Sequence, residues 1–232
     1  MKIFYLSLKV GLIFSLLISF LSLHSQNNYE KILLESFPED GTAGTAIVVK
    51  NGEIIYKGAS GMANLELGIE AKPEHIFRLG SITKQFTSVA ILQLKEDGKL
   101  NLEDNFTKYL PDYPLGDRKV TVAQLLNHTS GIASYTDIPG FMQNRTRNFM
   151  AVDSLINYFQ KFPFDFEPGE AWNYNNSAYI LLGAIIEKIS GMSYAEYLEK
   201  EIFDKIGLEN TYYDDSRKII KNRIPGYSPS NN

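Results

Sequence analysis

Ser81 and Lys84 are the residues of this sequence best suited to nucleophilic chemistry. A serine hydroxyl attacks well only after a neighbouring base removes its proton, and a neutral lysine amine can act as that base. Residues three apart on an α-helix share one face, so the two side chains can meet. The same spacing also fits a capping serine beside a surface lysine, and the pair alone leaves both interpretations open.

Tyr174 and Asn176 form a second polar cluster. They follow the turn residues 168–169 and precede a helix predicted from Ser177, which places them on a loop. A tyrosine beside a lysine ammonium has a lowered phenol pKa and can carry a proton between a serine and a leaving group. An asparagine offers a donor and acceptors that can orient a lysine and a substrate amide. Alternatively, Tyr174 is a half-buried packing aromatic and Asn176 caps the following helix.

Two predicted helices position these clusters. Residues 82–98 repeat apolar side chains at helical spacing directly after Gly80 and Ser81. Ser81 is therefore expected at a helix N-terminus, where free backbone N–H groups and the helix dipole favour negative charge. Residues 166–191 contain a turn, an aromatic and polar stretch, and a strongly apolar helix that ends at Gly191.

Strand signals precede this helical region. Residues 45–58 contain two β-branched runs around Asn51 and Gly52, which is a strong hairpin signal. Further helices are predicted near 27–37, 152–162 and 193–210, and another begins near 120 and is stopped by residues 129–131. An exposed loop is predicted over 136–149. Strands followed by a long helical region favour an α+β arrangement over a βαβ repeat.

The first 25 residues differ from the rest of the chain. Lys2 and Lys9 precede an uncharged apolar run, and Ser25 is a small residue in the polar segment that follows. This pattern predicts a secretory signal peptide over 1–25 and an exported protein, periplasmic or secreted. A retained membrane anchor is the alternative. The sequence has no cysteine, which excludes disulfides and lipid attachment through a thiol.

The composition suits one compact domain, residues 26–232, or two subdomains folded as one. Cleavage of residues 1–25 would remove two lysines and no acidic residue, so the formal charge would change from −4 to −6. An acidic domain without a basic stripe has no electrostatic footprint for nucleic acid.

The residues 81–84, 125–132 and 168–183 together resemble the serine β-lactamase and penicillin-binding protein superfamily. The likeness is greatest to its class C-like branch of esterases and D-alanyl-D-alanine carboxypeptidases. It extends from the first hairpin to residue 213. The resemblance implies a β-lactamase/transpeptidase-like fold, with an antiparallel sheet flanked by helices and a helical subdomain.

The resemblance also implies a role for each matched residue. Ser81 would be the acylated nucleophile, and Lys84 would accept or relay its proton. Tyr174 would act first as general base and then as acid to the leaving group, while Asn176 would hydrogen-bond Lys84 and substrate. The backbone N–H of Ser81 would stabilise the tetrahedral oxyanion.

The sequence departs from the family at its third motif, a Lys- or His-x-Gly on an inner strand. Residues 205–207 fit the letters but end a predicted helix, residues 50–52 form the hairpin turn, and His128 is followed by Thr and Ser. We therefore expect an N-terminal portion of a longer protein, with the C-terminal strands and helix missing. The hairpin would then have an unpaired edge.

Other polar residues have simpler interpretations. His75 and His128 lack companion groups, which favours structural roles, and no spacing is typical of zinc ligands, so no metal or cofactor is expected. Arg145 and Arg147 are candidates to border the cleft and meet an anionic substrate. Four acidic residues are predicted to lie at a solvated helix end and in the loop that follows: Glu96, Asp97, Glu103 and Asp104.

The leading hypothesis is an exported, monomeric serine hydrolase that works through an acyl-enzyme on Ser81. Its substrate would be a small molecule or peptide: an ester, a D-amino-acid peptide or a β-lactam. Two alternatives stay open. One is an inactive homologue that binds peptidoglycan-like ligands, and the other is a secreted interaction domain whose motif matches are accidental.

Overall fold

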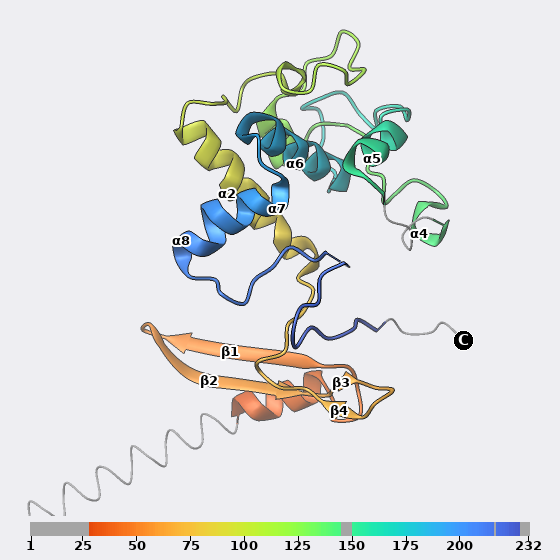
Figure 1. Ribbon diagram of the computed structural model, residues 1–232. Helices are drawn as coiled ribbons and strands as arrows, with labels where there is room; N and C mark the ends of the chain where they lie inside the picture. The colour runs from red at the N-terminus through yellow and green to blue at the C-terminus, as the bar shows by residue number, and fades with distance from the viewer. Residues whose placement is uncertain (1–27, 145–149, 216, 228–232) are drawn as a thin grey trace, which may run out of the picture. The chain divides into compact units, whose positions relative to one another are not determined.

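The computed structural model describes residues 28–144, 150–215 and 217–227. The predicted signal peptide, Arg145 and Arg147 lie outside these ranges. The chain divides at Arg78/Leu79 and again at Asp215/Ser216 into two compact units. The strand unit comprises the described residues up to 78 and after 216, and the helical unit comprises Leu79–Asp215 (Figure 1). The order confirms the α+β prediction.

The strand unit is built around the predicted hairpin. Strand β1 (Gly44–Lys50) pairs antiparallel with β2 (Glu53–Ser60). Asn51 and Gly52 have φ angles of 53° and 82°, and two consecutive positive values define the tight hairpin turn that twisted strands prefer. The register shifts after Val48, which makes a β-bulge.

Short elements complete the strand unit. Strand β3 (Met62–Asn64) pairs antiparallel with β4 (Ile69–Glu70), and each sheet of the described chain has two strands. Residues 28–36 are helical, and the Tyr29 ring lies 5.6 Å from that of Tyr56 on β2. The hairpin side chains Ile47, Val49 and Ile54 remain more than half exposed.

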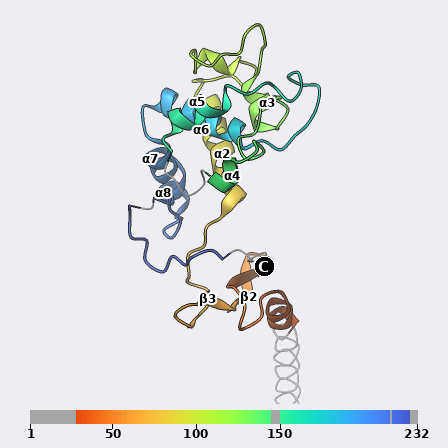
Figure 2. The same cartoon turned by 90° about the vertical axis from the view of Figure 1, so that its right-hand side faces the viewer.

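The helical unit is arranged around α6 (Asn176–Ser190), which packs against four other helices (Figures 1 and 2). Those helices are α2 (Thr83–Glu96), α3 (Val122–Leu126), α5 (Val152–Phe159) and α7 (Tyr194–Leu198). The remaining elements are η1 (Gly80–Ile82), η2 (Phe106–Lys108), α4 (Phe141–Asn144), the π-helical η3 (Glu199–Phe203) and α8 (Asp204–Ile206).

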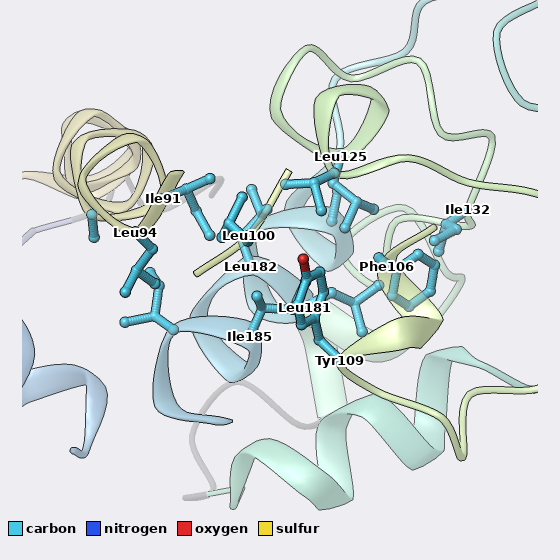
Figure 3. Packing of buried hydrophobic residues seen from close by; sticks show 14 of the residues in the cluster. Ile91, Leu94, Leu100, Phe106, Tyr109, Leu125, Ile132, Leu181, Leu182 and Ile185 are labelled. Atoms are coloured by element: carbon cyan, nitrogen blue, oxygen red, sulfur yellow. The ribbon is translucent and has the colours of Figure 1, made fainter. Parts of the chain in front are cut away.

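The core of the helical unit forms where α6 meets α2 and α3. Leu182 and Ile185 of α6 lie among Ile91 and Leu94 of α2 and Leu125 of α3, all at 0% exposure (Figure 3). Burial of one such side chain contributes about 1.5–3 kcal/mol. This core holds α2, which carries Lys84, and α6, which begins at Asn176, in a defined relative position.

The ends of α6 depend on two capping residues. The Asn175 side chain accepts a hydrogen bond from the Ala178 N–H at 2.8 Å, and Gly191 ends the helix with a φ of 71°. The predicted end at Gly191 is confirmed. The suggestion that Asn176 caps the helix is wrong, because Asn175 is the cap and the Asn176 side chain is free for other contacts.

The loop predicted as exposed over 136–149 is partly buried. Residues Phe141–Asn144 form α4, and Ile138 and Phe141 are at most 9% exposed. The Phe141 ring lies 4.9 Å from that of Tyr135, which ties the segment to the core. The polar residues of this stretch favoured an exposed loop, although its side chains Ile138 and Phe141 are buried. In the described ranges, no helix combines the length and apolar character needed to cross a membrane.

Candidate active site

Ser81 lies in the 3₁₀ turn η1, which continues directly into α2. Lys84, one turn later, points its Nζ at the Ser81 Oγ over 3.4 Å. The predicted helical spacing therefore does bring the two side chains together. The backbone N–H groups of a first helical turn have no partner within the helix, and Ser81 lies in such a turn.

Tyr174 approaches the same hydroxyl from the loop before α6. Its Oη donates a hydrogen bond to the Ser81 Oγ at 2.6 Å, across 93 residues of sequence. Tyr174 is 37% exposed and Ser81 is also exposed. A phenol at this distance can exchange a proton with the serine.

Lys84 connects the two clusters. Its Nζ donates to the Asn176 Oδ1 at 2.7 Å and lies 4.6 Å from the centre of the Tyr174 ring. The Tyr179 ring is 5.3 Å away from the same Nζ. An ammonium placed over aromatic rings is attracted by their π electrons. The four predicted residues, Ser81, Lys84, Tyr174 and Asn176, thus form one connected group.

The Tyr174 phenol has a pKa below its ordinary value. Burial acts to raise the pKa, but hydrogen bonding with Lys84 and Ser81, together with the Lys84 charge, outweighs that effect. The phenolate of Tyr174 is therefore more accessible than that of a tyrosine in water.

Hydroxyl groups on a neighbouring loop orient the Asn176 amide. Its Nδ2 donates to the Thr136 Oγ1 at 2.9 Å, and its backbone N–H donates to the Ser134 Oγ at 3.3 Å. The two hydroxyls are 3.0 Å apart. With Nδ2 held by Thr136, the carbonyl oxygen Oδ1 faces Lys84.

Sequence reasoning did not identify Ser134 and Thr136. The available signal was weak: two hydroxyl residues at alternate positions share one side of an extended chain. Nothing in that pattern specifies contact with a helix that begins 40 residues later.

The loop that carries these hydroxyls follows α3. This helix ends at Leu126, earlier than predicted, and residues 127–132 are irregular. Gly131 has a φ of 72°, and a Cβ there would lie 2.0 Å from the Phe166 carbonyl oxygen. The Gly131 oxygen accepts the Asp165 N–H at 2.8 Å. Only glycine allows this close approach between the loop and the chain that leads to Tyr174.

The two histidines considered as bases make local contacts instead. His128 accepts a hydrogen bond from the Asn175 N–H at Nδ1, 3.1 Å away. Burial, and then the Lys84 charge, lower the pKa of His128. In the strand unit, the His75 Nδ1 accepts the Lys72 N–H at 3.0 Å and closes a turn.

Asp104 is not the freely solvated carboxylate that the sequence suggests. Its Oδ2 accepts hydrogen bonds from the Lys108 Nζ at 2.8 Å, the Tyr109 Oη at 2.5 Å and the Asn101 N–H at 3.2 Å. The bonds from Lys108 and then Tyr109 hold the pKa of Asp104 at about 2. The carboxylate organises the loop around η2.

The letters that fit a third motif lie in unsuitable positions. Lys205 belongs to α8 and bonds to Glu201, and Gly207 ends that helix with a φ of 69°. Residues 50–52 form the end of β1 and the hairpin turn. In the part of the chain that the structure describes, no group of three or more His, Asp or Glu side chains is arranged to hold a metal ion.

Known proteins are similar to this protein over most of the chain. The family model described as Beta-lactamase matches residues 33–231. Penicillin-binding protein 4* of Bacillus subtilis (strain 168) is 36% identical over 190 residues, which cover 80% of this chain and 41% of that protein. The chain thus spans less than half the length of this curated relative.

Two solved structures are also similar. The octameric penicillin-binding protein homologue from Pyrococcus abyssi matches with a TM-score of 0.73 and 30% identity, over 89% of this chain and 48% of its own. The D-stereospecific amidohydrolase from Streptomyces sp. matches with a TM-score of 0.65 and 33% identity, over 77% of this chain and 54% of its own.

Proposed function

The chain belongs to the beta-lactamase family and has its fold, and from this premise we propose a serine hydrolase that works through an acyl-enzyme on Ser81. The observation that carries the proposal is that the side chains of Tyr174 and Lys84 both approach the Ser81 hydroxyl. The Ser81 Oγ has the Tyr174 Oη at 2.6 Å and the Lys84 Nζ at 3.4 Å. A nucleophile within reach of a proton acceptor and of a cation that stabilises it is the arrangement that covalent catalysis requires.

In the first step, the Tyr174 phenolate removes the proton from the Ser81 Oγ as that oxygen attacks the substrate carbonyl carbon. The Lys84 ammonium, held by Asn176, stabilises the phenolate, consistent with the lowered pKa of Tyr174. The carbonyl π electrons move onto oxygen, and the Ser81 N–H stabilises the negative charge. One such donor contributes about 3 kcal/mol to a transition state.

In the second step, the tetrahedral intermediate collapses and the bond to the leaving group breaks. The proton now on Tyr174 passes to the leaving oxygen or nitrogen, which departs as a neutral alcohol or amine. Water then attacks the Ser81 ester, with Tyr174 again accepting the proton, and the reverse transfer returns the hydrogen to the Ser81 Oγ. The Lys84 ammonium compensates the charge that develops on either oxygen.

The substrate is an acyl compound of the ester, D-amino-acid peptide or β-lactam class. The Streptomyces structure, named as a D-stereospecific amidohydrolase, supports an amide of a D-amino acid, and the Bacillus relative is named a penicillin-binding protein. Both matches extend over only part of the related chain, so the substrate belongs to the proposal.

Export and oligomeric state are also part of the proposal. The charged, apolar and polar succession in residues 1–25 supports a signal peptide and a periplasmic or secreted protein. We retain the expectation of a monomer, although one structural neighbour is octameric. Sedimentation of the purified protein distinguishes the two states.

Covalent labelling of Ser81 tests the proposal. The protein expressed from its complete reading frame is incubated with a fluorophosphonate, and with a penicillin, and then digested for mass spectrometry. We expect one adduct on the peptide that contains Ser81, absent from Ser81→Ala. A folded protein that forms no adduct, and hydrolyses neither esters nor D-amino-acid amides, contradicts the hydrolase and favours a non-catalytic binder of peptidoglycan-like ligands.

A further inference from the structure

We propose that His128 is the positioning residue for Tyr174, and that it acts in its neutral form. The inference rests on the proposed function, because it names the residue that holds the general base of that reaction. His128 lies in the loop after α3, and its hydrogen bonds go to the backbone on either side of Tyr174 rather than to Ser81 or Lys84, so its effect on catalysis passes through Tyr174.

His128 holds the backbone on both sides of Tyr174. Its carbonyl oxygen accepts the Asn173 N–H at 3.0 Å, and its Nδ1 accepts the Asn175 N–H at 3.1 Å. The residues before and after Tyr174 are thus bound to one residue of another loop. Two bonds that bracket a residue restrict the direction in which its side chain leaves the backbone, and proton transfer is sensitive to that direction.

The imidazole also contacts the phenol ring itself. The ring centres of His128 and Tyr174 are 4.7 Å apart, and those of His128 and Tyr179 are 5.2 Å apart. Tyr179 is fixed in turn, since its Oη donates to the Leu126 carbonyl oxygen at 2.9 Å. A flat ring at position 128 therefore joins Tyr174 to an anchored side chain of α6.

The backbone conformation limits which residues can replace His128. Its φ is 65°, in the left-handed region that asparagine, aspartate and histidine enter more readily than other side chains with a Cβ. Asparagine retains this tolerance and carries an acceptor at the δ position, but has no ring. Phenylalanine retains a ring but has no acceptor. These two residues separate the hydrogen bond from the ring contact.

The hydrogen bond from the Asn175 N–H requires an unprotonated Nδ1 on His128. Protonation of His128 therefore tests the role of this bond. The titratable groups that face the imidazole are Lys84 from α2, Tyr174 from the loop and Tyr179 from α6. Protonation would remove the acceptor and place a second cation near Lys84. Burial, and then the Lys84 charge, lower the pKa of His128, which favours the neutral form.

The test compares wild type, His128→Asn and His128→Phe in the protein from the complete reading frame. The measured quantity is the second-order rate of fluorophosphonate labelling at Ser81, followed from about pH 4 to about pH 9, which extends below the ordinary histidine range because the pKa of His128 is lowered. We expect His128→Phe to react about tenfold more slowly at neutral pH, as for a lost hydrogen bond. His128→Asn should remain within about threefold of wild type, because it keeps the acceptor.

The pH profile separates positioning from a purely structural role. In His128→Asn the inflection that belongs to the histidine should disappear from the acidic limb, since asparagine does not titrate. Thermal melts establish which variants are folded. If His128→Phe does not fold, the His128→Asn profile decides alone.

The inference is overturned if folded His128→Phe labels as fast as wild type, or if His128→Asn keeps an unchanged acidic limb. An unlabelled wild-type Ser81 has a different meaning. It overturns the proposed hydrolase and, with it, the role of His128, so the two failures are told apart by the wild-type reaction.

Discussion

The strand unit and the helical unit differ in how far their apolar side chains are buried. In the strand unit, Ile47, Val49 and Ile54 are more than half exposed, and the buried apolar residues in its described part are Leu33 and Ala63. In the helical unit, one continuous cluster of buried side chains joins α2, α3, α5, α6 and α7. The two units therefore differ in the free energy available to hold a fixed geometry.

This difference explains where the candidate site lies. Ser81, Lys84, Tyr174 and Asn176 all belong to the helical unit. A catalytic geometry needs side chains whose rotamers are restricted by packing and by supporting hydrogen bonds. A two-stranded hairpin with exposed apolar residues is only marginally stable and cannot supply that support alone.

The largest expected effect separates the units by their chemistry. Tyr174→Phe removes the proton carrier, so we expect kcat/KM for an ester substrate to fall about 10²–10⁴-fold with little change in melting temperature. Tyr227→Phe, in the strand unit, removes the hydrogen bond to Glu66 and should leave kcat/KM near the wild-type value. Similar losses in both variants would show that the strand unit also contributes to the chemistry.

A second comparison separates the units by their stability. Leu182 is 0% exposed, so Leu182→Ala leaves a cavity in the core. We expect it to lower the free energy of unfolding by about 2–5 kcal/mol. Ile54→Ala, at a position 62% exposed, should cost about 0.5 kcal/mol or less. Native-state hydrogen exchange of amides in each unit measures the two costs separately. Equal costs would contradict the contrast in packing.

A smaller effect tests the support of Asn176 within the helical unit. Thr136→Val removes the acceptor for the Asn176 Nδ2, so the amide is no longer held with its oxygen toward Lys84. We expect about a tenfold slower labelling of Ser81. Thr45→Val, on the exposed face of the hairpin, is the matched control. An unchanged rate in Thr136→Val would mean that Lys84 alone orients the amide.

The smallest effect concerns acid stability in the two units. Asp104 has a pKa of about 2 against an ordinary value of 3.8, and hydrogen bonding with Tyr227 lowers the pKa of Glu66. Depressed carboxyl pKa values stabilise the fold above the unfolded-state pKa, and that stability is lost as pH falls through the folded-state value. We expect Asp104→Asn to flatten the decline in stability between about pH 4 and about pH 2.

Glu66→Gln is the companion variant in the strand unit. Its effect should appear in hydrogen exchange of strand-unit amides below the ordinary glutamate pKa, and leave helical-unit amides unaltered. Identical pH dependence of exchange in both units would indicate that they unfold together rather than separately.

Much of the molecule followed from local patterns. The hairpin at Asn51 and Gly52, the end of α6 at Gly191 and the meeting of Ser81 with Lys84 depend on residues a few positions apart, where helix period and turn chemistry apply. The misplaced features depend on contacts between distant parts of the chain. The loop after α3 approaches the Phe166 carbonyl oxygen closely at Gly131, and α4 is buried because Phe141 packs into the core.

The chain's residue types and spacings were enough to name a serine, a lysine, a tyrosine and an asparagine as partners, through their resemblance to a family. The folded chain decided how these partners are held. Thr136 lies 40 residues from Asn176, and His128 lies 47 from Asn175. Contacts across such separations have no period in the sequence, because they arise only when the buried surface of α6 brings two loops to one end of a helix.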